Sequence, residues 1–196
     1  MADAAELTKD KAPAKPGKRA AKLEKLKKAE TFNFAIDPDV RAYLTTAARE
    51  QGLDVSHLMQ KIVEGYVIDT APKDLDLAQR LAAKRAVIDL AQKTATDMDK
   101  AGDFDDHFIL NVIKGCEAEA SFVTAYETAT KAGDDSAKAR VKARRARIAL
   151  NQQLGRVIKR TVGAKSLRKE GGGIARGSAT DTLITTYTLL TKGPAA

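Results

Sequence analysis

The chain has 196 residues, which is enough for one domain or two small ones with a hydrophobic core. Apolar residues make up 43% of it, aromatic residues only 5%, and tryptophan is absent, so we expect helical packing rich in Ala and Leu. No stretch approaches the roughly 18 apolar residues of a membrane span, the N-terminus lacks the apolar core of a secretory signal, and a single cysteine excludes an internal disulfide framework. These features predict a cytoplasmic protein with no membrane partner.

The net charge of +8 is unevenly distributed along the chain. Residues 1–30 carry +4, residues 31–73 carry −2, residues 74–135 carry −6 and residues 136–196 carry +12. Two basic ends around a mildly acidic middle favour a polyanionic partner. The alternative is a solvated surface whose charge only keeps the protein in solution.

Residues 1–30 are rich in Ala, Lys and Pro and predict a basic, largely disordered tail. The next segment, TFNFAID, alternates polar and apolar side chains and predicts a strand. Its apolar face would consist of Phe32, Phe34 and Ile36, and its opposite face of Thr31, Asn33 and Ala35. No second strand follows, so the hydrogen-bonding partner of this strand must come from another molecule.

Two helices are predicted directly after the strand. Asp37 is a good N-cap with Pro38 at the first helical position, and Gly52 suits the end of that helix. A second helix should begin at Asp54. One face of it is apolar at helical spacing, with Val55, Leu58, Met59, Ile62, Val63, Tyr66 and Val67. Little else nearby could cover this face, so it needs a partner surface.

Residues 30–68 resemble the ribbon-helix-helix family of DNA-binding proteins, because they contain a strand, a helix, a tight turn and a second helix in this order. The resemblance implies an obligate homodimer whose two strands pair into a ribbon that lies in the major groove of duplex DNA. It places Thr31, Asn33 and Ala35 against base edges, where Asn33 could bond to adenine and Ala35 could touch a thymine methyl. It also places Asp54, Val55 and Ser56 at a DNA phosphate, through the free N–H groups that begin the second helix. Two departures from the family weaken this readout: the carboxylate of Asp54 would repel a phosphate, and the strand contains no Lys or Arg.

The acidic block predicts two helices, about residues 74–100 and 104–131, with breaks at Gly102 and Gly133. We expect their core to contain Leu77, Leu81, Ile88, Ile109, Val112, Ile113, Phe122, Val123 and Tyr126. The region 71–162 is thus interpreted as a helical domain after a ribbon-helix-helix domain at 31–70, and the predicted fold class is mainly α.

The sequence KARVKARRARIAL at 138–150 is the densest source of positive charge. On a helix it would display a basic face for DNA phosphates, made by Lys138, Arg140, Lys142, Arg144, Arg145 and Arg147. The alternative is that this helix docks on the acidic block and neutralises it within the molecule. The basic, Gly-rich and Thr-rich segment at 163–196 is ambiguous around residues 178–191, where apolar spacing favours a short helix and β-branched composition favours a strand. Of these two we expect the helix.

No catalytic set, metal site or cofactor site is predicted. Residues 97–108 partly match a calcium-binding EF-hand loop, but Ala101 and Phe108 stand where two of the oxygen ligands belong. His57 and His107 lack ligand spacing, and Cys116 is expected to be a buried core thiol.

The sequence therefore predicts a dimeric protein that binds duplex DNA. Its layout, a short DNA-binding motif followed by about 120 further residues, resembles that of plasmid mobilisation proteins, which assist a relaxase. A transcriptional repressor or a partition protein would have the same motif. The competing interpretation is a helical scaffold that binds a protein partner and has solubilising basic ends.

Overall fold

The computed structural model describes residues 33–131 and 136–193. The chain divides into two compact units, residues 1–37 and 38–196. In the first unit only Asn33–Asp37 are described, and they form neither helix nor strand within the single chain. Thr31 and Phe32 of the predicted strand lie outside the described residues, as do the tail at 1–30 and Gly133. The strand therefore stays a prediction.

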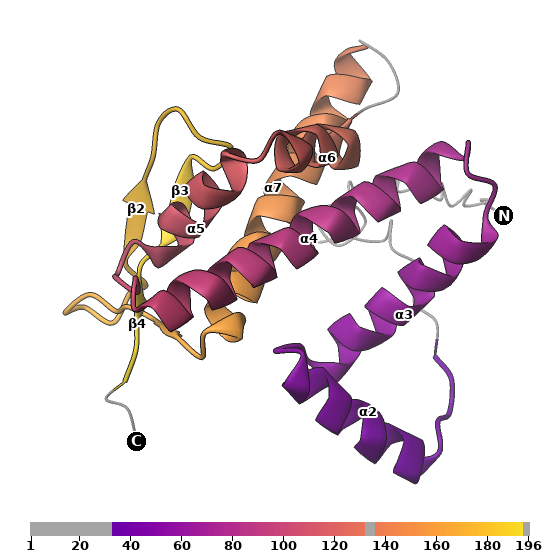
Figure 1. Ribbon diagram of the computed structural model, residues 1–196, viewed down its shortest axis with the longest axis horizontal. Helices are drawn as coiled ribbons and strands as arrows, with labels where there is room; N and C mark the ends of the chain where they lie inside the picture. Colours follow the sequence, from indigo (N-terminus) through magenta and orange to yellow (C-terminus); the bar gives the residue numbers. More distant parts are fainter. Residues whose placement is uncertain (1–32, 132–135, 194–196) are drawn as a thin grey trace, which may run out of the picture. The chain divides into compact units, whose positions relative to one another are not determined.

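The second unit contains six helices and four short strands among its described residues. The helices are α2 (Pro38–Glu50), α3 (Val55–Thr70), α4 (Asp76–Ala101), α5 (Phe108–Glu117), α6 (Ala120–Thr130) and α7 (Ala137–Thr161) (Figure 1). The strands are β1 (Lys165–Ser166), β2 (Arg176–Ser178), β3 (Thr186–Thr188) and β4 (Leu190–Thr191). The chain is thus mainly helical, as the sequence predicts. None of the helices in the described ranges has the length and apolar character needed to cross a membrane.

The helix pair α2–α3 forms where its capping residues predict it. Pro38 is the first residue of α2, and Gly52 in the following turn has a φ of +64°, a conformation that favours glycine. An added Cβ at Gly52 would lie 3.7 Å from the backbone of Thr161, so this turn packs closely on the end of α7. Asp54 caps α3 by accepting a hydrogen bond from the backbone N–H of His57 at 2.9 Å.

The core of the unit lies between α4, α5, α6 and the second half of α7. Most of the predicted core residues are buried, namely Ile88, Ile109, Val112, Ile113, Phe122 and Tyr126. Leu77 was predicted to be buried but is 45% exposed, because it lies in the first turn of α4, away from this core. Cys116 is fully buried, which confirms its expected place, and burial raises the pKa of its thiol.

The prediction of one helix over 104–131 was wrong. The segment forms two helices, α5 and α6, with a break at Ala118 and Glu119. Neither residue is a helix breaker, so tertiary packing decides the break: both helices bury apolar faces against α4. The end of α5 is also held from outside, since the carboxylate of Glu117 accepts a hydrogen bond from the backbone N–H of Leu183 at 2.7 Å.

The expected helix within 178–191 was also wrong, because this segment contributes to two antiparallel pairs of strands, β1–β4 and β2–β3. β-Branched threonines suit the pleated surface of a strand, as the alternative interpretation held. In the β2–β3 pair Gly177 lies opposite Tyr187, and an added Cβ at Gly177 would come within 2.5 Å of the tyrosine ring. Only glycine at position 177 therefore leaves room for the ring of Tyr187 to cross the neighbouring strand. The hydroxyl of Tyr187 lies 2.6 Å from Nδ1 of His107.

Candidate nucleic-acid interface

The helices α2 and α3 leave large apolar side chains uncovered. In α2, Val40 is 47% and Tyr43 is 72% exposed, and in α3, Val63 is 61% and Tyr66 is 70% exposed. Ile62 on α3 is 47% exposed. We call these five residues the apolar surface. Scattered apolar residues are normal on a protein surface, but a cluster on two successive helices is typical of an interface.

The described part of the predicted strand is exposed as well. Asn33 and Ala35, which the resemblance places against base edges, are both exposed. Phe34 is 66% exposed and Ile36 is 37% exposed. These apolar side chains belong to the first compact unit and have no cover there among the described residues.

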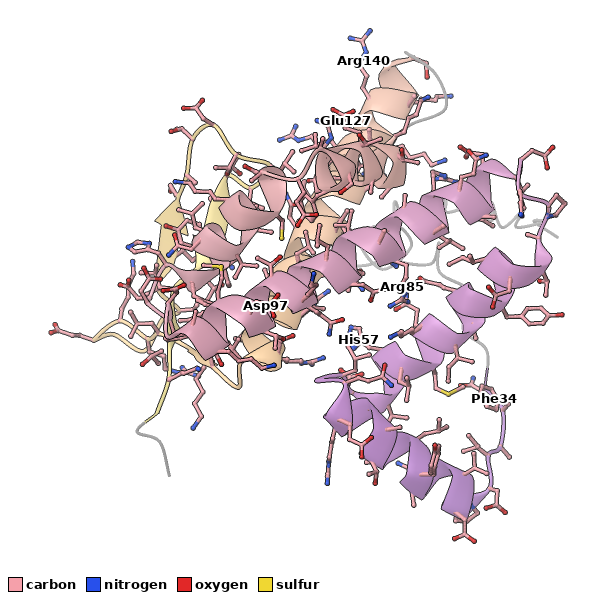
Figure 2. All side chains as sticks on the ribbon, in the orientation of Figure 1. Phe34, His57, Arg85, Asp97, Glu127 and Arg140 are labelled. Carbon is pink, nitrogen blue, oxygen red and sulfur yellow. The ribbon has the colours of Figure 1, made fainter. Side chains whose placement is uncertain are left out.

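The N-terminus of α3, the predicted phosphate site, is occupied by a cluster of polar and ionisable side chains. The side chain of His57 donates from Nδ1 to Oδ2 of Asp54 at 2.7 Å. The guanidinium of Arg160, near the end of α7, lies 3.0 Å from the same oxygen. Val55 is partly buried and Ser56 is exposed beside this cluster. Figure 2 labels His57 at this end of α3.

The cluster has an electrostatic consequence for Asp54. The hydrogen bond from the backbone N–H of His57 is the largest cause that lowers the pKa of Asp54, to about 2, and the side chains of His57 and Arg160 lower it further. The carboxylate is therefore ionised at neutral pH. A phosphate at this helix end would have to compete with it, as the departure from the family already indicated.

The predicted basic face lies on α7. This helix contains nine Lys and Arg residues and no Asp or Glu. Its second half is anchored in the core by Leu150, Leu154, Val157 and Ile158. In its first half the six predicted cations are all exposed, namely Lys138, Arg140, Lys142, Arg144, Arg145 and Arg147. Figure 2 shows Arg140 at the outer end of the helix.

The helix docks on the acidic helices through apolar contacts more than through charge. It packs on α4, α5 and α6, yet among the described side chains no ion pair joins Lys142, Arg144 or Arg145 to a carboxylate. Two apolar residues of this helix, Val141 and Ile148, are 50% and 49% exposed because the first half of α7 extends beyond the core.

The two predicted phosphate sites do not form one patch. Arg160 beside Asp54 and Arg147 at the end of the basic face lie on the same helix, and at about 1.5 Å per residue the stretch between them spans about 20 Å. One strand of duplex DNA covers that distance in about six nucleotides, at about 3.4 Å each. A single duplex is therefore long enough to reach both sites.

Some contacts that shape this region have no local signal in the sequence. Glu64 on α3 is bound by Lys84 at 2.8 Å and by Arg85 at 3.5 Å, both from α4, so two cations of the acidic block are used inside the fold. The pairing of Asp54 with Arg160 is equally remote. No group of His, Cys, Asp and Glu in residues 33–131 and 136–193 could hold a metal ion.

Comparisons with protein-family models, with curated proteins and with solved structures found no match to this chain.

Proposed function

We propose that the chain is a homodimer that binds duplex DNA, with residues 31–70 forming a ribbon-helix-helix unit and the basic face of α7 supplying further phosphate contacts. The observation that carries the DNA part is the charge of α7: six exposed cations on a helix with no acid. A row of exposed cations of this kind attracts the closely spaced phosphates of a polyanion.

The apolar surface supports the dimer. Its residues Tyr43, Val63 and Tyr66 are each more than half exposed, which is costly for a folded monomer in water. A second copy of the same helix pair would cover it and would bring the second strand that Asn33–Ile36 need for hydrogen bonding. Both requirements are met by the same partner.

The proposed role in the cell is that of a cytoplasmic accessory factor in plasmid mobilisation, next to a relaxase, or of a transcriptional repressor. The layout of the sequence is what supports it. The chemistry of the basic face supports DNA binding.

A gel-shift titration at two salt concentrations tests DNA binding. The variant Arg144→Gln, Arg145→Gln, Arg147→Gln should lower affinity for every duplex alike. It should also reduce the slope of log K against log salt by about 0.9 for each phosphate that the protein no longer neutralises. An unchanged slope with a lowered melting temperature would assign these arginines to the fold and leave DNA binding to the ribbon and the tail.

Sedimentation tests the dimer. Val63→Glu places a charge in the apolar surface and should give a folded monomer that no longer binds DNA tightly. Ile174→Glu is the matched control, because Ile174 is also an exposed apolar residue, at 49%, but lies far along the chain in the C-terminal segment. A wild-type protein that sediments as a folded monomer at micromolar concentration would contradict the ribbon-helix-helix proposal.

The exposed Val141 and Ile148 beside the arginines of α7 favour the second candidate, a scaffold that binds an acidic protein. It predicts no affinity for duplex DNA at either salt concentration.

A further inference from the structure

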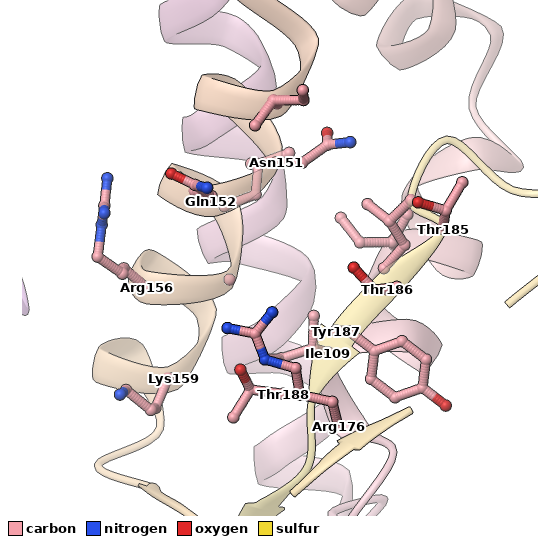
Figure 3. A pocket seen from close by; sticks show the side chains of 15 residues that line it. Ile109, Asn151, Gln152, Arg156, Lys159, Arg176, Thr185, Thr186, Tyr187 and Thr188 are labelled. Atoms are coloured by element: carbon pink, nitrogen blue, oxygen red, sulfur yellow. The ribbon is translucent and has the colours of Figure 1, made fainter. Parts of the chain in front are cut away.

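A cavity of about 330 Å³ lies between α7, α5 and the β2–β3 pair (Figure 3). This volume is within the range of about 300–1,000 Å³ that is usual for small-molecule sites. The cavity is separate from the apolar surface and from the six cations at the start of α7, since it is lined by other residues.

The wall of the cavity is positively charged. Arg156 and Lys159 of α7 and Arg176 of β2 line it, and none of the described lining residues carries a carboxylate. No ion pair within the described ranges uses Arg156 or Arg176, and Lys159 only donates to the hydroxyl of Ser166 at 3.2 Å. In Figure 3 the ends of Arg156 and Lys159 lie on the side of α7 away from β3, whereas Arg176 reaches across toward α7. Arg176 is therefore the cation best placed to meet an anion in the cavity, and the two cations of α7 add to the positive potential there.

The strand register holds Arg176 at the cavity. Arg176 pairs with Thr188, and side chains of directly paired residues lie on the same face of a sheet. Thr186 shares this face by the alternation of the strand, whereas Tyr187 between them points to the other side. Figure 3 shows the side chain of Arg176 reaching from β2 toward α7, with the hydroxyls of Thr186 and Thr188 near it.

The floor of the cavity is apolar. Ile109 and Ile113 of α5, Leu154 of α7 and Ile184 line it. Gly155 adds room, because the only heavy atom within 4 Å of an added Cβ there, outside its own helix backbone, would be Cδ1 of Ile109, at 3.8 Å. Packing therefore does not require a glycine at this position. Glycine is also unfavourable in the interior of a helix, so helix stability does not explain it either.

From this combination we propose that the cavity binds a small organic anion: a phosphate or carboxylate held by Arg176 in the positive potential of Arg156 and Lys159, with an apolar body on the isoleucine floor. A guanidinium forms charge-assisted hydrogen bonds with both kinds of anion, and the threonine hydroxyls can donate to the remaining oxygens. A bare inorganic ion would leave the apolar floor uncovered. The proposal does not depend on DNA binding.

The test is calorimetric titration of the full chain with phenyl phosphate, which combines the charge with an apolar ring. Inorganic phosphate and phenol are the controls that carry only one of the two features. We expect phenyl phosphate to bind at least about tenfold more tightly than either control. Arg176→Gln should weaken phenyl phosphate binding by at least about tenfold, through loss of a charge-assisted hydrogen bond.

Two further variants keep the result independent of folding. Gly155→Ala should weaken binding by filling the cavity, while its melting temperature should stay the same or rise, because Ala is the better helix former. Lys165→Gln removes an exposed cation that does not line the cavity and should bind as the wild type does.

The proposal is overturned if phenyl phosphate does not bind at millimolar concentration, or if inorganic phosphate binds equally well. Equal binding of phenyl phosphate by the wild type, Arg176→Gln and Gly155→Ala would overturn it too.

Discussion

Replacing Asp54 with Ser isolates the charge of the cluster at the start of α3. Serine caps a helix about as well as aspartate, so the backbone hydrogen bond can be kept while the carboxylate is removed. A pKa lowered from 3.8 to about 2 would correspond to about 2.5 kcal/mol at about 1.36 kcal/mol per pKa unit. The Asp54 side chain is 45% exposed, and solvent screening at such a site reduces the value to about 1 kcal/mol.

The pH dependence of this loss has a definite sign. The folded state binds the Asp54 proton more weakly than the unfolded state, so the carboxylate stabilises the fold above about pH 4, and this contribution is lost as the pH falls toward 2. Urea denaturation at pH 7 should show Asp54→Ser to be less stable by about 1 kcal/mol. At pH 3 the difference from the wild type should be clearly smaller.

Asp54→Asn is the matched control, because asparagine also caps and is neutral at every pH. Both variants should lose the same pH-dependent contribution to the free energy of unfolding. A difference from the wild type that is equal at pH 7 and pH 3 would refute the assignment of this stability to the charge of Asp54.

Three further results are expected. Asn33→Ala should reduce discrimination between a preferred and a random duplex by about 1–3 kcal/mol in gel shifts and leave the dimer intact; equal loss on both duplexes would mean that Asn33 does not contact bases. Gly177→Ala should lower the free energy of unfolding by about 1–3 kcal/mol in urea denaturation, because the new methyl group meets the ring of Tyr187 at 2.5 Å, and an unchanged value would contradict this packing. Cys116 is fully buried and its thiol has a raised pKa, so iodoacetamide should modify it only as the chain unfolds in urea; rapid modification of the native protein at pH 7 would contradict its burial.

The parts of the fold that could be predicted from the sequence are those with local causes. Pro38, Gly52 and Asp54 stand at the limits of α2 and α3, where helix-start, turn and capping preferences place them. The break between α5 and α6 could not be predicted, since Ala118 and Glu119 both favour a helix and the break comes from packing on α4. For the threonine-rich segment, the β-branched composition indicated strands correctly, whereas the apolar spacing indicated a helix.

The candidate site shows the same division. That the cations of KARVKARRARIAL would be exposed on one helix could be predicted from their spacing and from the apolar residues that follow. That Arg160 would meet Asp54, and that Arg176 would meet α7 across a cavity, depends on strand register and helix docking. Neither is encoded within a short window of sequence.

The first half of α7 is a helix with little to hold it. No residue from 140 to 149 is buried, and the like charges at Arg140, Arg144 and Arg147 are three and four positions apart, where they repel. A helical segment of this length is marginal in water on its own. We therefore expect its backbone amides to exchange with deuterium far faster than those around Leu154 and Ile158. Because a bound polyanion would cancel the repulsion, the slowing of exchange in these amides on adding DNA would report occupancy of the basic face one residue at a time.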